Sequence, residues 1–308
     1  DHAVVGWGDP GLPDLHGMYW SSSNDFTEAM YYRLAQAVSF SNSFIKNASE
    51  LSGDEVNVFI AEARFLRAYA YYNLLDLYGN VPLTTEISTE LPTQSNRTEL
   101  FNFIESELTE IESTLLASNE YGRVDNIAAH ALLSRLYLNA EAWTGQDRYA
   151  DCITYSQNVI NSGYSLNMND ANGNGTAYDE LFMADNDING AQNEFIFTLN
   201  FDGMQSQTYG GTTFLVHAAI GGSMNPGNFG VNGGWGGLRT TKNLVNQFAV
   251  DLDALNSSLG SQSDWGLVGS ATPNGWNGPD VEMYQTGPQE FSIYTELASG
   301  ELKFRFNE

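Results

Sequence analysis

Residues 62–86 read EARFLRAYAYYNLLDLYGNVPLTTE, and this stretch decides the fold class. Its apolar residues recur at three- and four-residue steps, the spacing of one face of an α-helix. Small alanines alternate with large side chains, so another helix can approach closely. We therefore predict an amphipathic helix in a helix-rich protein. The apolar face is expected to consist of Ala63, Leu66, Ala70, Leu74 and Leu77, with a second, aromatic row of Phe65, Tyr69 and Tyr72.

The sequence also predicts where this helix ends. Gly79 suits the left-handed conformation that commonly ends a helix. Pro82 disfavours helical backbone at the residue before it, so Val81 to Leu83 should leave in an extended form. On periodicity alone, this is an ordinary helix end in an all-helical protein.

Paired helices make up the first half of the predicted fold. Residues 147–162 should pair with the preceding helix as an antiparallel hairpin across Gly145. Helix pairs of this size are typical of tetratricopeptide-type (TPR) units, although the strict 34-residue signature is absent. The helices are expected at residues 26–47, 54–78, 98–117, 126–143 and 147–162.

The composition and the predicted secondary structure of the chain change after Gly163. Residues 165–193 are rich in Asn, Asp and Gly, residues 193–200 have a strand-like pattern, and residues 203–237 form a long Gly- and aromatic-rich loop region. A short helix is expected at residues 240–248. Strand-like runs follow at 291–297 and 302–306, separated by an Ala-Ser-Gly turn.

Several strings resemble the SusD/RagB family, outer-membrane lipoproteins that bind glycans at the surface of Bacteroidetes cells. They are EARFLRAYAYYNLLDLYGNVPL, YDELF, NEFIFTLNF and GGWGGLRTTKNLVNQF. Near the C-terminal end, WGLVGSATPNGW and GELKFRFN resemble the β-sandwich modules of SusE and SusF. The resemblance implies a mainly α fold of TPR-like helix pairs with long Gly/aromatic loops. It implies a helical glycan-binding domain over residues 1–260, incomplete at both ends, and the start of a β-sandwich module over residues 261–308.

Composition limits the function. The chain has 308 residues, and its 12 basic residues against 38 acidic ones give a net charge of −26. Such a surface repels nucleic acid and anionic lipid headgroups. The single cysteine, Cys152, cannot form an internal disulfide, and no Cys/His cluster has zinc-ligand spacing. No signal peptide and no long apolar run are visible.

The sequence offers little for catalysis. No GxSxG, HExxH or P-loop motif is present. His130 lies in an apolar helical pattern and is interpreted as a packing residue. Residues 170–175 copy part of an EF-hand calcium loop, but position 12 is Leu181, so a turn cluster is the favoured interpretation. We expect no cofactor and no metal. An acidic pair for glycoside hydrolysis stays open, whereas the family resemblance implies binding without turnover.

Aromatic residues in the Gly-rich loops are the first candidates for glycan binding, because loops on a rigid scaffold concentrate binding residues. Trp235 leads, since Gly233-Gly234 and Gly236-Gly237 flank its ring and allow a ligand to approach. The alternative is a tryptophan packed under those glycines. Arg239 would either bind sugar hydroxyls or tie its loop to a carboxylate. The candidates in this region are Trp7, Tyr209, Trp235 and Arg239, with Trp20 and Phe214 in the same loops.

The last strand supplies a second set of candidates. Alternation along a strand places Lys303, Arg305 and Asn307 on one face. That polar face would offer hydrogen-bond donors to sugar hydroxyls, with Trp276 as a stacking platform, or would simply be solvated. The opposite face, with Leu302, Phe304 and Phe306, is expected to be core, and Trp265 is expected to anchor the sandwich.

Taken with the resemblance, these observations favour a lipid-anchored protein on the extracellular face of the outer membrane. It would capture glucan oligosaccharides for import through a SusC-like TonB-dependent transporter, its lipid anchor lying outside this chain. Starch-type α-glucan is the first expected ligand and a β-1,3-glucan such as laminarin the second. Two alternatives remain: a TPR-like scaffold that binds proteins but no glycan, and a glycoside hydrolase with unrecognised carboxylates.

Overall fold

The computed structural model describes residues 2–3, 7–183, 185–201, 210–229, 231–239, 256 and 259–306. The chain divides into two compact units, one of residues 3–237 and one of residues 238–308 with residues 1–2. The domain boundary expected at residue 260 stays a prediction. The short helix expected at 240–248 lies outside the described residues.

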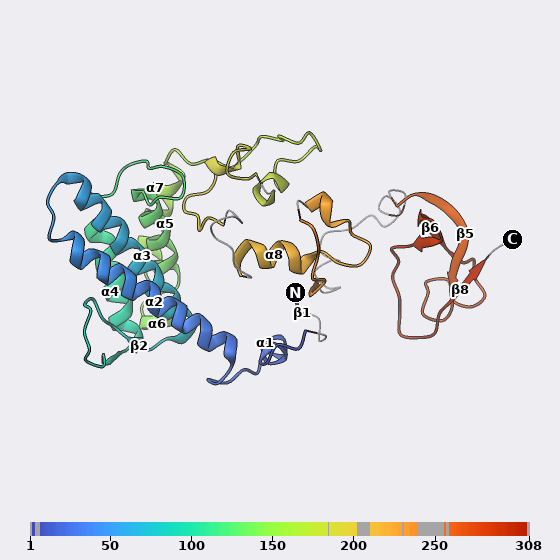
Figure 1. Ribbon diagram of the computed structural model, residues 1–308, viewed down its shortest axis with the longest axis horizontal. Helices are drawn as coiled ribbons and strands as arrows, with labels where there is room; N and C mark the ends of the chain where they lie inside the picture. Colours follow the sequence, from blue (N-terminus) through green and yellow to red (C-terminus); the bar gives the residue numbers. More distant parts are fainter. Residues whose placement is uncertain are drawn as a thin grey trace. The chain divides into compact units, whose positions relative to one another are not determined.

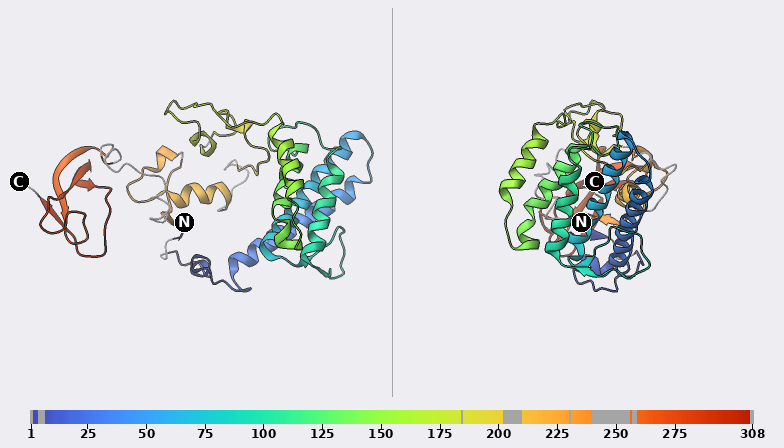
Figure 2. Two further views of the ribbon diagram at one scale, coloured as in Figure 1. Left: turned by 180° about the vertical axis from the view of Figure 1, so that it is seen from behind. Right: turned by 90° about the vertical axis from the view of Figure 1, so that its left-hand side faces the viewer.

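The larger unit is built on a bundle of helices (Figure 1). Helix α3 packs against α2 on one side and α4 on the other, and α5 packs against α7. Figure 2 shows the same helices lying alongside one another in two further views. Their bounds are α2 (Asp25–Ala48), α3 (Asp54–Tyr78), α4 (Arg97–Ile111), α5 (Asn126–Leu138), α6 (Ala140–Thr144) and α7 (Tyr149–Ile160).

Side-chain caps define where these helices begin. The Asn24 side chain accepts the backbone N–H groups of Phe26 and Thr27 at the start of α2. Asn96 and Glu99 form a reciprocal capping box at the start of α4. Asp125 accepts the Ala128 N–H at 2.9 Å and begins α5.

Two predicted helices are shorter than expected. The helix predicted to reach residue 117 ends at Ile111, and a turn carries Leu115 into the core without further helix. The helix predicted over 126–143 breaks at Asn139 into α5 and α6. Gly145 ends α6 with φ of 75°, which supports the expected turn before α7.

Helix α3 is buried around most of its circumference. The alanines expected at helix crossings, Ala61, Ala63, Ala68 and Ala70, are buried. The predicted apolar face is partly wrong, because Leu66 and Leu77 are 41% and 55% exposed. With neighbours on two sides, α3 buries the aromatic row as well as the alanine row, and no single stripe describes it.

A buried polar network ties three helices together. The Arg67 guanidinium donates to Glu107 at 2.5 Å and to Asn42 at 2.8 Å. Arg64 donates to the other oxygen of Glu107 at 2.7 Å. Each buried charge thus has a partner, as a low-dielectric interior requires.

Short elements and loops complete the larger unit. The extended backbone expected at Val81 is confirmed, since β2 pairs antiparallel with β3. The strand predicted at residues 193–200 is wrong: a 3₁₀ turn ends at Asn193, no strand follows it up to residue 200, and Phe197 packs edge-to-face on Phe65 instead of joining a sheet. The bounds are α1 (Leu12–Gly17), β2 (Val81–Pro82), β3 (Gln94–Ser95), η1 (Asp179–Phe182), η2 (Ala191–Asn193), α8 (Gly211–Ala219) and η3 (Pro226–Phe229). Strand β1 (His2–Ala3) lies near the N-terminus, and β4 (Leu238–Arg239) belongs to the second unit.

The second unit is an antiparallel sheet. Its strands are β5 (Ser261–Val268), β6 (Val281–Gly287), β7 (Glu290–Ser292) and β8 (Lys303–Phe306), in the spatial order β7-β6-β5-β8. Trp265 lies opposite Phe306, and Leu267 lies opposite Phe304. The predicted fold class, mainly α with TPR-like helix pairs and a C-terminal β module, is confirmed at this level.

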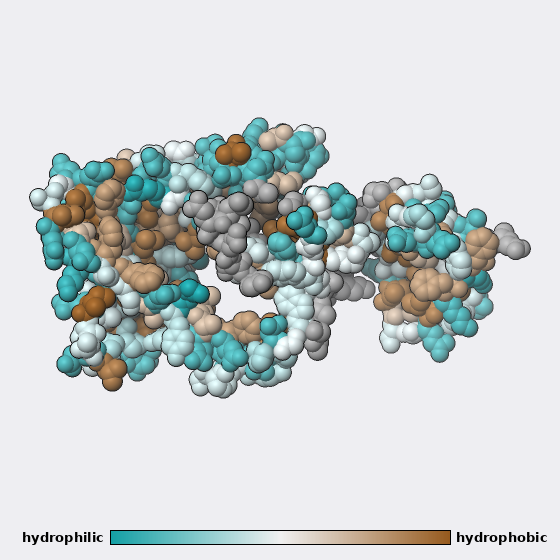
Figure 3. All heavy atoms as spheres, viewed as in Figure 1, coloured by the Kyte–Doolittle hydropathy of each residue, from teal (hydrophilic) through white to brown (hydrophobic). Residues whose placement is uncertain are grey.

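Apolar side chains reach the surface of both units, where they lie in brown among hydrophilic residues (Figure 3). None of the helices in the described residues combines the length and the apolar character needed to cross a membrane.

Candidate functional site

Three predicted aromatic residues come together in the larger unit. The Trp7 ring lies 6.0 Å from Phe214 and 6.4 Å from Trp235, and the Phe214 and Trp235 rings are 6.3 Å apart. All three pairs meet edge-to-face. His217 stacks on Trp235 at 5.0 Å. We call Trp7, Phe214, His217 and Trp235 the aromatic cluster.

The end of α8 positions Trp235. The last carbonyl groups of a helix lack partners within it. Here the Trp235 N–H donates to the His217 carbonyl at 2.7 Å, and the Gly237 N–H donates to the Ala218 carbonyl at 2.9 Å. The glycine-rich segment therefore runs along the C-terminal end of α8, which places Trp235 beside the residues of that helix.

The glycines beside Trp235 leave the space that this packing needs. A Cβ at Gly234 would collide with the Ile220 carbonyl, and a Cβ at Gly237 would collide with the Trp7 ring. Trp7, Phe214 and Trp235 are each partly buried. Trp235 therefore packs against its neighbours and keeps part of its surface exposed, and its role in glycan binding stays a prediction.

Sequence reasoning did not single out His217. Its Nδ1 lies 3.0 Å from the Thr213 carbonyl, which can only accept, so Nδ1 donates. His217 lies three residues after Phe214 and therefore shares a helix face with it. That spacing could have identified His217 from the sequence. The cluster offers ring faces for sugar C–H groups and an imidazole for a hydroxyl.

The other loop candidates are outside the cluster as described. Tyr209 lies outside the described residues, and Arg239 is described only in its backbone. Trp20 is exposed and makes no described ring contact with the cluster.

One residue of the predicted polar face of β8, Lys303, lies beside Trp276. The Lys303 ammonium lies 5.6 Å from the centre of the Trp276 ring, a cation–π arrangement. The Arg305 guanidinium donates to Asp280 at 2.8 Å, which raises the pKa of Arg305. Asn307 lies outside the described residues. Arg305 is therefore already engaged by a carboxylate.

The opposite face of β8 is not core within the described part of the chain, which corrects the sequence-based expectation. Phe304 and Phe306 are 63% and 53% exposed. They lie opposite Leu267 and Trp265 on β5. The alternation of side chains along β8 agrees with the prediction, but among the described residues this face is covered at Leu267 and left largely open at Phe304 and Phe306.

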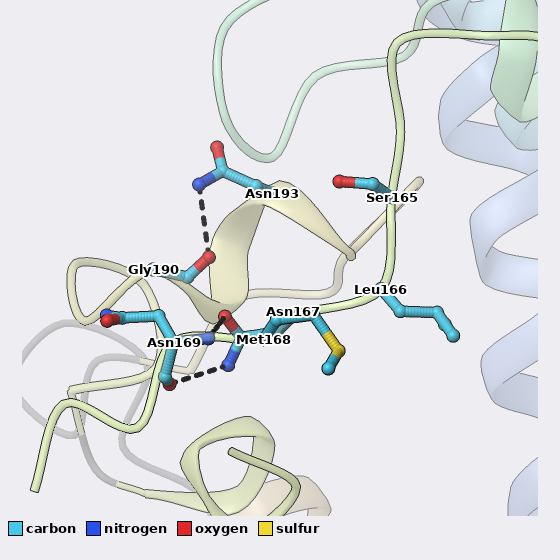
Figure 4. A pocket seen from close by; sticks show the side chains of 7 residues that line it. All are labelled: Ser165, Leu166, Asn167, Met168, Asn169, Gly190 and Asn193. Carbon is cyan, nitrogen blue, oxygen red and sulfur yellow. Dashed lines mark hydrogen bonds between the residues drawn. The ribbon is translucent and has the colours of Figure 1, made fainter. Parts of the chain in front are cut away.

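The Asn-rich loop of residues 165–193 lines a hollow of about 330 Å³ (Figure 4). Its amides bond to the loop itself: Asn169 donates to the Asn189 carbonyl at 2.8 Å, and Asn193 donates to the Gly190 carbonyl at 3.1 Å. These bonds fix the loop and leave the hollow without an aromatic ring. The lining residues are Ser165, Leu166, Asn167, Met168, Asn169, Gly190 and Asn193.

The EF-hand-like segment beside it is a hydrogen-bonded turn. The Asp170 carboxylate accepts the backbone N–H groups of Asn174 and Gly175. The amides of Asn172 and Asn174 donate to Asp179, which lowers the pKa of that carboxyl. In the described residues no group of His, Cys, Asp and Glu side chains is arranged to hold a metal ion.

Comparison with known proteins identifies a family for the helical part. Residues 16–138 match the SusD-like family described as starch-binding and associating with the outer membrane. The chain is similar to the starch-binding protein SusD of Bacteroides thetaiotaomicron, with 36% identity over 245 residues that cover 79% of this chain and 43% of that protein. The chain spans less than half the length of the curated relatives it matches.

Solved structures support the same fold. A SusD-like protein from Bacteroides fragilis has a TM-score of 0.50 and 25% identity, covering 60% of this chain and 35% of its own. A structure with xylogluco-oligosaccharide has a TM-score of 0.66 and 20% identity, covering 90% of this chain and 54% of its own. The SusE/SusF-like character of residues 265–308 remains a prediction.

Proposed function

Because this chain belongs to the SusD-like family, we propose that it captures neutral glycans at the outer membrane. The observation that carries the proposal is the aromatic cluster, in which rings from three separate segments meet at one place. Aromatic rings bind the C–H faces of sugars, while polar groups bind hydroxyls.

The ligand in this proposal is a glucan. Starch-type α-glucan comes first, because the relative with 36% identity is named as a starch-binding protein. A β-1,3-glucan such as laminarin comes second, since it is also a curved, neutral glucose polymer. The net charge of −26 favours a neutral ligand over a polyanionic one.

The proposal includes the partner and the location that the family resemblance implies. The protein would be lipid-anchored on the extracellular face of the outer membrane and would pass oligosaccharides to a SusC-like TonB-dependent transporter. It would bind without cleaving, so its ligand would be recovered intact.

One observation favours a second candidate, a protein-binding scaffold. Helix α2 exposes apolar side chains at helical spacing along one face, and such a face is suited to bind a partner. The face consists of Phe26, Met30, Phe40 and Phe44.

Affinity electrophoresis in gels containing starch, laminarin or a neutral control polysaccharide separates these candidates. We expect retardation in one glucan and a weaker effect for Trp235→Ala. Phe40→Ala is the matched control, because it removes an exposed ring from α2 and leaves the cluster intact.

Each outcome has a definite meaning. Retardation that Trp235→Ala weakens and Phe40→Ala leaves unchanged supports glycan binding at the cluster. Equal retardation of all three proteins moves the site away from the cluster. No retardation in either glucan, with Phe40→Ala impairing capture of a transporter barrel, favours the scaffold.

A further inference from the structure

We propose that Tyr178 and Phe182, two aromatic residues of the Asn-rich loop, form a second glucan-binding platform on the larger unit. The two residues are 70% and 68% exposed. Their rings meet edge-to-face, with centroids 5.3 Å apart and an angle of 65° between the rings. The inference rests on the proposed function, since it takes the same ligand class, but its residues are separate from the aromatic cluster.

The loop buries a charge and exposes two rings, the reverse of the usual arrangement. Glu180, which lies between Tyr178 and Phe182 in the sequence, is only 2% exposed. Its carboxylate accepts the Asn172 backbone N–H at 2.7 Å and the Asn189 side-chain amide at 2.9 Å. A loop that only connected two elements would gain more from burying the rings and exposing the carboxylate. The arrangement therefore leaves the rings available to a ligand.

Hydrogen bonds hold the backbone beside each ring. The Asn167 side chain donates to the Ala177 carbonyl at 3.2 Å, immediately before the first ring. The Asn186 side chain donates to the Leu181 carbonyl at 3.0 Å, immediately before the second ring. The bonds to Glu180 fix the turn between them. Because the rings are already positioned, binding a ligand orders little of the loop and costs less conformational entropy.

The rings and their polar neighbours suit a sugar. Ring surfaces bind the C–H faces of glucose units, and two inclined rings can contact neighbouring units of a bent chain. The Tyr178 hydroxyl can both donate to and accept from sugar hydroxyls. Asp185 and Asp187, exposed three and five residues after Phe182, can accept further hydroxyl hydrogens.

The charge of the loop argues against most other occupants. Residues 165–193 contain five acidic residues and no Lys or Arg. The loop therefore repels nucleic acid, anionic lipid and a second copy of this chain, whose net charge is −26. A neutral glucan meets no such repulsion. Charge favours one other occupant, a basic segment of a partner protein, whose binding would weaken in salt.

Isothermal titration calorimetry of the whole chain with maltoheptaose and with laminarihexaose tests the inference. In the Trp235→Ala background, which removes the first site, we expect one remaining site. Adding Tyr178→Ala or Phe182→Ala should weaken binding there about threefold to tenfold, because each removes one stacking ring. Adding Tyr178→Phe, which keeps the ring, should weaken binding less. Both platform residues are largely exposed, so the variants should fold, and unchanged circular dichroism at 222 nm checks this.

Ile188→Ala in the same background is the matched control. Ile188 belongs to the same loop and is 75% exposed, but it carries no ring. The inference predicts no change in glucan affinity for this variant. Equal weakening by Ile188→Ala, Tyr178→Ala and Phe182→Ala would show that the loop binds without ring stacking and would overturn the inference.

The remaining outcomes separate this inference from the proposed function. If Trp235→Ala alone abolishes all binding, the cluster binds glucan, the platform does not, and only the inference fails. If Trp235→Ala leaves total binding unchanged and Phe182→Ala abolishes it, the cluster is the part that fails. If the wild type binds neither glucan, the proposed ligand class and the inference fail together.

A partner protein at the platform would give a different result. Tyr178→Ala and Phe182→Ala would then leave glucan affinity in the Trp235→Ala background unchanged. The same two variants would instead impair capture of a transporter barrel at low salt. That result would assign the rings to a protein contact and overturn the inference.

Discussion

The helical bundle and the C-terminal sheet differ in what their apolar residues do. In the bundle, Leu100, Ile104 and Leu133 have no exposed surface, because facing helices cover them. In the sheet, Phe304 and Phe306 keep more than half of their surface exposed. The bundle thus has a closed apolar core, whereas the sheet leaves these two rings largely uncovered.

This difference follows from how each unit is built. Helices of the bundle pack side by side, α2 against α3, α3 against α4 and α5 against α7, so each helix covers part of its neighbour. The described sheet is a single layer with two faces, and a layer needs a partner to close a core. Substitutions of buried apolar residues in the bundle and of exposed ones in the sheet therefore test whether the two units differ in this way.

The largest effect is expected for Leu133→Ala in α5. The side chain is fully buried, so its removal loses apolar burial and leaves a cavity. We expect the free energy of unfolding to fall by about 2–5 kcal/mol. Urea denaturation followed by circular dichroism at 222 nm, which reports mainly on the helices, measures the loss. A loss below about 1 kcal/mol would show that the bundle core is not tightly packed.

The sequence predicted the bundle well because its signals are local. The bounds expected for α3, residues 54–78, agree with the structure, since apolar periodicity and Gly79 mark the helix and its end. The faces of α3 were harder to predict, because burial of Phe65 depends on Phe197, far along the chain. The strand predicted around Phe197 failed for the same reason, since a strand needs a partner that local pattern does not specify.

The sequence identified the aromatic residues of the candidate site, but it did not predict which of them lie together. Trp7 and Trp235 are 228 positions apart and meet only because the 235–237 segment binds the end of α8. His217 joins them through that same contact. On the last strand, alternation separated Lys303 from Phe304 correctly, but alternation does not say which face is covered.

The next effect in size is expected for Asp125→Ala at the start of α5. Asp125 is buried, accepts the Ala128 N–H at 2.9 Å and accepts the Tyr164 hydroxyl at 2.8 Å. Loss of this cap should cost about 1–2 kcal/mol of unfolding free energy. Asp125→Asn, which keeps a capping oxygen, is the matched control and should recover part of the loss. Equal losses in both variants would mean that the negative charge matters more than the cap.

A smaller effect that depends on pH is expected for Tyr164→Phe. Burial, together with the hydrogen bond to Asp125, raises the pKa of Tyr164. In the unfolded chain the phenol ionises near about pH 10, earlier than in the folded protein. The contribution of Tyr164 is therefore complete below about pH 10 and is lost as the pH rises toward the folded pKa.

The variant should lose about 0.5–1.5 kcal/mol at neutral pH, the net value of one hydrogen bond. Because phenylalanine does not ionise, its stability should also fall less steeply than that of the wild type above about pH 10. Urea midpoints measured across that range provide the comparison. Parallel curves for the two proteins would show that Tyr164 ionises equally easily in the folded and unfolded states.

The smallest effect on stability is expected for Phe304→Ala in β8. Phe304 is 63% exposed, so removal of its ring exposes little that was buried. We expect a change within about 0.5–1 kcal/mol, far below that for Leu133→Ala. Hydrogen exchange of the β5 backbone, which pairs with β8, measures the change directly in the sheet. A large increase in β5 exchange would mean that Phe304 stabilises the sheet, and the contrast between a closed bundle core and an open sheet face would then fail at this residue.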